Sequence, residues 1–196
     1  MSLPALFSLK GRTALVTGGS KGLGKAMARG FAEAGADVMI SSRHEDELKT
    51  AAAEIARGLD VKVEWMVADM IDRAQVKALA HEAVKRLGKV DILVNNAGSN
   101  HPQAIDEITD EAWDRVVELN LTSCMSLTRE LVPGMKERQW GRIIHISSVL
   151  GVGSKEKRNV YSATKAALIG MAKASAIDLG TFNITVNCIC PGPFLT

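Results

Sequence analysis

The chain has 196 residues, 46% of them hydrophobic and 23% charged, with a formal net charge of +2 at pH 7. This composition excludes an intrinsically disordered chain and is enough for one domain with a substantial core. The small net charge and the aromatic content of 4% give no footprint for nucleic acid. No apolar run approaches the ~18–20 residues that a membrane span needs. We therefore expect a single cytoplasmic domain over residues 1–196, with no nucleic-acid or membrane partner.

Strand and helix signals alternate along the chain. Short β-branched, apolar runs predict strands at 13–17, 38–41, 61–67, 90–95, 142–147 and 184–190. Longer stretches between them predict helices at 22–34, 45–57, 73–87, 110–139 and 160–179. This order predicts βαβ units, and hence an α/β, Rossmann-type, doubly wound parallel sheet between two layers of helices.

A glycine-rich turn joins the first predicted strand to the first helix. It reads Gly18-Gly-Ser20-Lys21-Gly22-Leu23-Gly24. Glycines here permit a tight turn and let backbone N–H groups approach a pyrophosphate at the positive end of the helix. The spacing differs from the general G-x-G-x-x-G fingerprint. An ordinary glycine-rich turn is the alternative, and the place of the motif in the first βα turn favours a dinucleotide.

The residues after the second strand bear on the choice of coenzyme. An NAD-selective site uses a carboxylate near this point for the ribose 2′-hydroxyl. Ser42 and Arg43 stand there instead, and Lys21 adds a second cation. Two cations suit a 2′-phosphate, so NADP(H) is favoured over NAD(H). The alternative is that both cations are solvated surface charges.

Polar residues also follow the third and fourth strands. Asp69 could bond an adenine amino group or cap the helix that begins near residue 73. Asn96, Ala97 and Gly98 end the fourth strand at the edge of the sheet where ligands bind. Asparagine there can tie strand ends together, and glycine permits close approach of a cofactor. A plain Asn/Gly turn is the alternative.

Candidate acid/base residues lie just before the last predicted helix and in its first two turns. Tyr161 and Lys165 are four residues apart and therefore share one helix face. A free phenol titrates near pH ~10, and a neighbouring ammonium favours the phenolate, which suits acid/base work. The pair Ser147-Ser148 ends the fifth strand and offers a hydroxyl for a substrate carbonyl oxygen. A lone Tyr/Lys pair would be a surface pair, but the serines and the glycine turn favour chemistry.

Two residues interrupt the apolar stripe of the predicted helix 110–139. Asn120 falls within the stripe, where an amide needs a partner. It is either a satisfied core residue, or it distorts the helix locally and binds a water leading outward from Lys165. Pro133 predicts a kink or an early end of the helix.

The three cysteines are Cys124, Cys188 and Cys190. Their odd number and sparse distribution suit a reducing compartment. Cys188 and Cys190 could form half of a metal site, but no second pair accompanies them. We predict buried structural cysteines and no metal.

Taken together, these motifs resemble the short-chain dehydrogenase/reductase family. The likeness covers nearly the whole chain and rests on the glycine turn 17–24, residues 95–98, Asn120, Ser148, the Tyr161/Lys165 pair and Pro191-Gly192. It implies strand order 3-2-1-4-5-6-7 and a catalytic tetrad of Asn120, Ser148, Tyr161 and Lys165, with Ser148 rather than Ser147 as the catalytic serine.

The same resemblance implies the coenzyme contacts and the assembly. Asp69 would lie at the adenine and Met70 would also contact the coenzyme, with Pro191, Gly192 and Thr196 around the nicotinamide carboxamide. A homodimer or homotetramer would form through the two long helices. Family members usually continue past the Pro-Gly loop with a substrate-covering helical segment and a last strand. Neither follows Thr196, so we expect either a truncated chain or a substrate pocket that lacks one wall.

The sequence resembles 3-oxoacyl-carrier reductases and gluconate 5-dehydrogenase-like members about equally. We predict an NADP(H)-dependent oxidoreductase that interconverts a ketone or 3-oxoacyl group and a secondary alcohol. The run 155–158, with three cations and one acid, suits an anionic or carrier-linked substrate or is a solvated loop. His101 faces either the substrate or solvent. A keto sugar acid is an alternative substrate, and a non-catalytic NADP-binding sensor is an alternative function.

Overall fold

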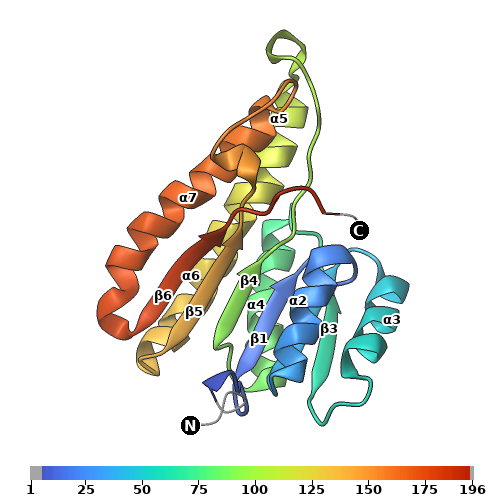
Figure 1. Cartoon of the computed structure of the whole chain (residues 1–196), viewed down its shortest axis with the longest axis vertical. Helices are drawn as coiled ribbons and strands as arrows, with labels where there is room; N and C mark the ends of the chain where they lie inside the picture. Colours follow the sequence, from blue (N-terminus) through green and yellow to red (C-terminus); the bar gives the residue numbers. More distant parts are fainter. Residues whose placement is uncertain (1–5, 195–196) are drawn as a thin grey trace.

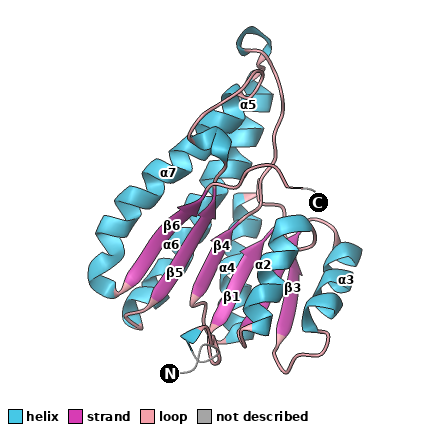
Figure 2. Ribbon diagram, viewed as in Figure 1, coloured by secondary structure: helices cyan, strands magenta, loops and turns pink. Residues whose placement is uncertain are grey.

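The computed structural model describes residues 6–194. Over these residues it contains one six-stranded sheet with the order β3-β2-β1-β4-β5-β6. The strands are β1 (Thr13–Thr17), β2 (Asp37–Ser42), β3 (Val63–Val67), β4 (Ile92–Asn95), β5 (Gly141–Ile146) and β6 (Ile184–Ile189). Every pairing is parallel, and Figure 2 shows the arrows pointing the same way. The predicted doubly wound parallel sheet is confirmed, although β3 and β4 each begin two residues later than predicted.

Helices cover both faces of the sheet. They are α2 (Gly22–Glu33), α3 (Glu45–Ala56), α4 (Arg73–Leu87), α5 (Asp110–Val117), α6 (Ser123–Glu137) and α7 (Asn159–Leu179). Figure 1 shows α2 and α3 on one face, with α4 and α6 on the other. The chain therefore has the predicted three-layer α/β/α architecture.

Two apolar cores fill the spaces between these layers. Residues of a strand alternate between the faces, so Leu15 of β1 joins the core under α4, α6 and α7. Its neighbours Ala14 and Val16 join the core under α2 and α3. All five residues of β1 are buried, which explains why its central residues, Ala14 to Val16, are apolar without alternation.

The predicted helix 110–139 is three segments. A π-helical turn, η2 (Glu118–Thr122), separates α5 from α6 and contains Asn120. The local distortion predicted at Asn120 is therefore present. The early end predicted at Pro133 is wrong, because α6 continues to Glu137. Leu131 and Met135, on either side of the proline, are buried in the core, and this packing holds the last turn in place.

The edge of the sheet explains a second difference from prediction. Cys124 is buried, but Cys188 and Cys190 are only half-buried. Within the described residues β6 pairs on one side only, with β5, and its exposed positions alternate with less exposed ones. The Cys188 thiol donates to the carbonyl of Leu168 on α7, at 3.3 Å.

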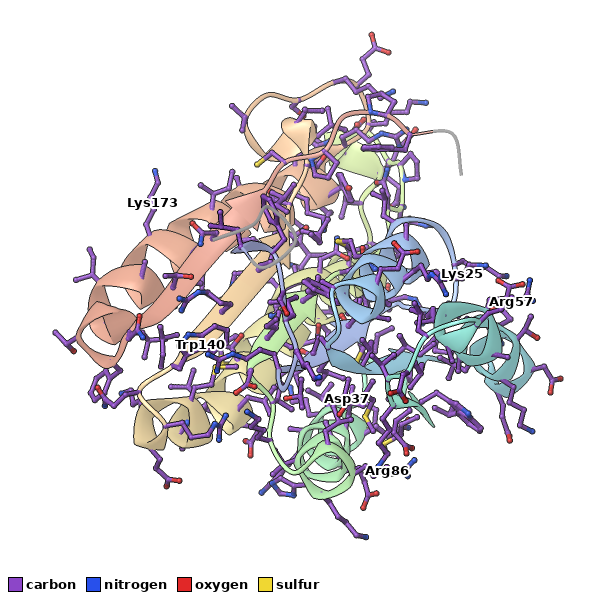
Figure 3. All side chains as sticks on the ribbon, turned by 60° about the horizontal axis from the view of Figure 1, so that its bottom comes forward. Lys25, Asp37, Arg57, Arg86, Trp140 and Lys173 are labelled. Atoms are coloured by element: carbon purple, nitrogen blue, oxygen red, sulfur yellow. The ribbon has the colours of Figure 1, made fainter. Side chains whose placement is uncertain are left out.

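Charged side chains gather on the outer faces of the helices. Figure 3 shows Lys173 projecting from α7 away from the sheet. Among the described residues, no helix combines the length and the apolar character that crossing a bilayer requires.

The strand order places the site. It reverses at β1, whose neighbours are β2 on one side and β4 on the other. In open parallel sheets, ligands bind outside the carboxyl ends of the strands at such a reversal. The loops that leave β1, β4 and β5 all emerge at this edge (Figure 2).

Candidate active site

A cavity of about 350 Å³ opens at the carboxyl ends of β4 and β5. It brings together most of the predicted chemical residues. Its lining comprises Leu23, Asn96, Gly98, Ser99, Asn100, Ile146, Ser147, Ser148, Tyr161, Lys165, Pro191 and Gly192. These residues come from five separate places in the chain, which only the fold assembles. Thr196, predicted beside Gly192, lies outside the described residues.

Lys165 is held rigidly at the floor of this cavity. Its side chain projects from α7, one turn after Tyr161, and the residue is 4% exposed. Its ammonium donates to the carbonyl of Ile146 at 2.7 Å and lies 5.6 Å from the centre of the Tyr161 ring. Burial lowers the pKa of the Lys165 ammonium, because the charged form loses hydration.

The two neighbouring serines make different contacts. The hydroxyl of Ser147 donates to the backbone carbonyl of Lys165 at 2.7 Å and so ties β5 to α7. The hydroxyl of Ser148 accepts from the backbone N–H of Leu150 at 3.1 Å, which leaves its own proton to donate. Of the two, Ser148 therefore keeps its proton free to donate within the cavity. Its role as the catalytic serine stays a prediction.

Asn120 does not line the cavity but lies directly behind it, fully buried. Its amide oxygen accepts from the N–H of Ser99 at 2.9 Å, and its amide nitrogen donates to the carbonyl of Ser99 at 2.9 Å. The same nitrogen donates to the hydroxyl of Thr164 at 3.1 Å. Asn120 thus fastens the loop after β4 to α7, beside Lys165. Of the two alternatives at this position, the satisfied core amide and the local helix distortion both hold.

Two glycines allow the close packing around Lys165. A Cβ atom at Gly98 would lie 3.2 Å from the Asn120 amide oxygen and 3.4 Å from the Lys165 nitrogen. A Cβ atom at Gly151 would lie 2.8 Å from both the Ser147 hydroxyl and the Lys165 carbonyl carbon. Gly98 was predicted to admit a cofactor, whereas Gly151 was missed because nothing in its local sequence signals the approach of α7.

A buried imidazole, that of His145, lies close enough to Lys165 to feel its charge. His145 of β5 is fully buried, and its Nδ1 atom lies 3.1 Å from the amide nitrogen of Asn95. Because that amide nitrogen can only donate, Nδ1 accepts and the ring is neutral. Burial, together with the Lys165 charge, lowers the pKa of His145 to about 4.

The glycine turn forms a cradle against the end of β4. Gly18 has a φ of +64°, and a Cβ atom there would lie 2.9 Å from the Asn96 amide nitrogen. That nitrogen donates to the carbonyls of Thr17 and Gly18 at 2.9 and 3.2 Å. The predicted tie between strand ends at Asn96 is therefore present.

Gly24 permits α2 to approach this turn, since a Cβ atom there would lie 2.1 Å from the Gly18 carbonyl oxygen. In the described chain, the first turn of α2 has no acidic residue and its N-cap makes no side-chain cap bond. Its N–H groups are therefore available to an anionic ligand. The residues present fit the pyrophosphate of a dinucleotide.

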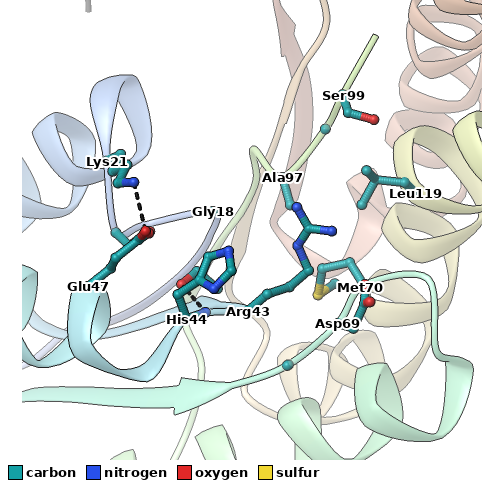
Figure 4. A pocket seen from close by; sticks show the side chains of 14 residues that line it. Gly18, Lys21, Arg43, His44, Glu47, Asp69, Met70, Ala97, Ser99 and Leu119 are labelled. Carbon is teal, nitrogen blue, oxygen red and sulfur yellow. Dashed lines mark hydrogen bonds and ion pairs between the residues drawn. The ribbon is translucent and has the colours of Figure 1, made fainter. Parts of the chain in front are cut away.

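A second cavity, of about 400 Å³, adjoins the first through Gly98 and Ser99, which line both. The predicted coenzyme residues Gly18, Ser20, Lys21, Ser42, Arg43, Asp69, Met70 and Ala97 line it. Figure 4 shows Arg43 extending into this cavity from the end of β2. The two cavities together form one groove across the carboxyl edge of the sheet.

Asp69 has a local role that differs from the predicted cap. Its carboxylate accepts from the N–H of Ile71 at 3.1 Å, within the turn after β3. The cap of α4 is Asp72, which accepts from Ala74 and Gln75. The capping alternative for Asp69 is therefore wrong, and its position in the second cavity stands.

Sequence reasoning missed an acid in the second cavity. Glu47, in the first turn of α3, accepts from Lys21 at 2.7 Å and from the Ser20 hydroxyl at 3.4 Å (Figure 4). The Lys21 ammonium beside it holds the pKa of the Glu47 carboxyl below its usual range. The inference that only cations stand near the ribose site is wrong, because α3 brings this residue back across 26 positions of the chain.

Comparison with known proteins agrees with the fold. Residues 12–196 match the family model described as short chain dehydrogenase. The chain is 38% identical over 189 residues to a D-beta-hydroxybutyrate dehydrogenase of Cupriavidus necator, covering 96% of this chain and 72% of that protein. It is 36% identical to a 3-oxoacyl-(acyl-carrier-protein) reductase of Thermotoga maritima, covering 94% of this chain and 74% of that protein.

A solved structure is similar over nearly the whole chain. The L-sorbose reductase of Gluconobacter frateurii, complexed with NADPH and L-sorbose, superposes with a TM-score of 0.94 at 38% identity. The match covers 97% of this chain and 72% of that one. The chain belongs to the short-chain dehydrogenase family of oxidoreductases.

Proposed function

We propose that the protein is an NADP(H)-dependent oxidoreductase that interconverts a ketone or 3-oxoacyl group and a secondary alcohol. One observation carries the proposal: Ser148, Tyr161 and Lys165 line a single cavity that opens into the groove beside the glycine turn. A phenol, a free hydroxyl and a buried ammonium around one point are the groups that protonation of a carbonyl oxygen requires.

Each side chain has a distinct part in this reaction. NADPH, when bound, supplies the hydride that reduces the carbonyl carbon. Tyr161 donates its proton to the carbonyl oxygen, and Ser148 donates a hydrogen bond to the same oxygen. The Lys165 ammonium stabilises the phenolate that remains, and Asn120 acts behind it as a positioning residue. In alcohol oxidation each proton moves in the opposite direction.

Arg43 and Lys21 support NADP(H) as the coenzyme. Both line the cavity that adjoins the glycine turn, where the adenosine ribose of a dinucleotide lies in this fold. Arg43 has no ion pair among the described residues, so its guanidinium is available to a phosphate. One structural relative was solved with NADPH.

The substrate we propose is a 3-oxoacyl or keto compound with an anionic group. The loops after β4 and before α7 form a further cavity lined by Pro102, Lys155, Glu156, Lys157 and Arg158. Three cations against one acid favour a carboxylate or phosphate. A keto sugar acid is the second candidate, favoured by the similarity to a reductase of the sugar L-sorbose.

We further propose a cytoplasmic location and a homodimer or homotetramer that forms through α6 and α7. A groove between these helices is lined by five apolar residues, Met125, Val132, Pro133, Met171 and Leu179, together with Thr128, Arg129, Lys136, Ser175 and Asp178. Ile177, on α7, is 81% exposed. Such apolar surface on a helix pair is typical of an interface. Light scattering of the purified protein would report the mass of the assembly.

The decisive experiment is a panel of 3-oxoacyl thioesters, 3-oxo acids and keto sugar acids assayed with NADPH and with NADH. We expect turnover with at least one class, and a loss of about 10²–10⁴-fold in kcat for Tyr161→Phe, the range that a general acid supplies. Unchanged kcat in that variant would remove Tyr161 from the chemistry. Tight coenzyme binding without turnover across the panel would favour the non-catalytic sensor.

A further inference from the structure

Glu47 occupies an unusual place for an acid. It projects from the first turn of α3 into the second cavity, where the coenzyme ribose is proposed to lie. One carboxylate oxygen accepts from Lys21 at 2.7 Å, and the other accepts from the Ser20 hydroxyl at 3.4 Å. Both partners belong to the glycine turn. The structure thus pairs one of the two proposed phosphate-binding cations with an internal anion.

The other charged groups of this cavity are arranged differently. Arg43 has no ion pair among the described residues, and the Asp69 carboxylate bonds the backbone of its own turn. Of the acids that line the cavity, Glu47 is the one bonded to a proposed phosphate-binding cation. Its side chain is 31% exposed and that of Lys21 is 73% exposed. An ion pair this exposed is weak, so a ligand anion can displace it.

The two coenzymes would meet this carboxylate in opposite ways. A 2′-phosphate carries between one and two negative charges near neutral pH, so it is repelled by Glu47 and must compete with it for Lys21. A ribose 2′-hydroxyl carries no charge and can donate a hydrogen bond to a carboxylate, which is how NAD-selective sites hold it. One residue therefore acts with opposite sign on the two coenzymes.

We propose that Glu47 is a coenzyme-specificity residue: it is the resident counter-ion of Lys21, it weakens NADP(H) binding, and it supports NAD(H) binding. This inference rests on the proposed nicotinamide chemistry and refines the proposed preference. The protein's NADP(H) selectivity is then a balance between Arg43 and Lys21 on one side and Glu47 on the other, and Glu47 holds that selectivity below what the two cations alone would give.

The matched control lies on the same turn of α3. Glu45 pairs with Lys49 at 2.8 Å and does not line the cavity. Glu47→Gln and Glu45→Gln each remove one negative charge from the first turn of α3, while glutamine keeps the shape of the side chain. Any general effect of net charge, or of charge at the start of the helix, appears in both variants.

The experiment measures the dissociation constants of NADPH and NADH by coenzyme fluorescence for the wild type and both variants. For Glu47→Gln we expect NADPH to bind about 3- to 10-fold more tightly, the scale of one exposed ion pair plus like-charge repulsion. NADH should bind up to about threefold more weakly, since the carboxylate that accepts from the ribose hydroxyl is lost. Glu45→Gln should leave the ratio of the two constants unchanged. In 0.5 M NaCl the gain for NADPH should shrink, because salt screens exposed charges.

Three results would overturn the inference: weaker NADPH binding in Glu47→Gln, equal tightening for both coenzymes, or no change in either. Weaker binding would mean that Glu47 holds Lys21 in position for the phosphate. The proposed preference is judged separately from the wild-type ratio and from Lys21→Ala. If the wild type favours NADH while Glu47→Gln still shifts the ratio toward NADPH, the preference is wrong and the role of Glu47 stands.

Discussion

The two ends of the groove are built in different ways. At the catalytic end, Lys165 is 4% exposed, Asn120 is fully buried, and both are held by bonds to backbone or to buried side chains. At the adenosine end, Lys21 is 73% exposed and bonds the half-buried side chain of Glu47. Backbone bonds fix positions more firmly than exposed ion pairs do. Under the proposed function, the catalytic groups are thus held by buried contacts of the fold, whereas coenzyme choice depends on side chains at the surface that can change without disturbing those contacts.

The glycine turn is the exception at the adenosine end, and it gives the largest expected effect. In Gly24→Ala the added Cβ atom would lie 2.1 Å from the Gly18 carbonyl oxygen and 2.6 Å from the Asn96 amide nitrogen. We expect a loss of about 3 kcal/mol or more of unfolding free energy, together with loss of coenzyme binding. Urea unfolding and coenzyme fluorescence would measure the two effects.

Gly30→Ala is the control on the same helix, because nothing lies within 4 Å of the added atom. It should stabilise the protein by up to about 1 kcal/mol, since alanine favours a helix interior over glycine. If both variants changed stability and coenzyme binding to a similar extent, the glycine turn would be able to move. The contrast between a rigid glycine turn and the exposed, replaceable side chains around it, Lys21 and Arg43, would then fail.

The buried catalytic side should show itself in the dependence of stability on pH. The pKa of His145 is lowered to about 4, mainly by burial and further by Lys165. Below the ordinary histidine pKa of ~6.5, His145 is protonated in the unfolded chain but stays neutral in the folded chain. This part of the stability is present above pH ~6.5 and is lost as pH falls toward 4, by about 3 kcal/mol in total.

His145→Asn should remove this component, so the difference in unfolding free energy between wild type and variant should narrow by that amount between pH 7 and pH 4. His101→Asn serves as the control, because His101 is exposed. A wild-type/His145→Asn difference that stays constant with pH would show that the imidazole is as free to charge as a surface group.

The two serines separate chemistry from architecture within the catalytic end. Ser148→Ala should lower kcat by about 10²-fold, since it removes one donor to the reacting oxygen, and should change unfolding free energy by less than about 1 kcal/mol. Ser147→Ala removes the buried bond to the Lys165 carbonyl, and should destabilise by about 1–2 kcal/mol while lowering kcat less than about tenfold. Steady-state kinetics and urea unfolding of both variants test this, and the reverse assignment would make Ser147 the donor.

This contrast between the ends also explains what the sequence could predict. The alternation of strands and helices, the glycine turn and the Tyr161/Lys165 pair follow from short-range patterns: hydrophobic period, spacing and turn chemistry. The strand order is implied by the family resemblance of the motifs. Even the distortion at Asn120 was predictable, because an amide in an apolar stripe is itself a local signal. Each of these local features can be recognised within a short stretch of the sequence, without knowing which distant segments pack against it.

The remaining features depend on distant segments that meet in space. Glu47 reads as one of three acids in the first turn of α3, and only the packing of α3 beside the glycine turn selects it. The close approach of Gly151 to α7 has the same character. The wrong cap at Asp69 arose because Asp72, three residues later, serves α4 equally well by chemistry and better by position.

The smallest effect on stability is expected at Arg43, at the exposed adenosine end of the groove. Arg43 is exposed and makes no ion pair among the described residues, so Arg43→Ala should shift the melting temperature by less than about 2 °C. The same change should raise the KM for NADPH by about tenfold and leave that for NADH nearly unchanged, because the guanidinium pairs with the 2′-phosphate alone. Kinetics with both coenzymes at low and high salt would test this. The difference between wild type and variant in the KM for NADPH should become smaller as salt rises. If Arg43→Ala instead weakened the binding of both coenzymes equally or lowered the melting temperature markedly, Arg43 would be needed to hold the folded structure. Coenzyme choice could then not vary independently of the fold.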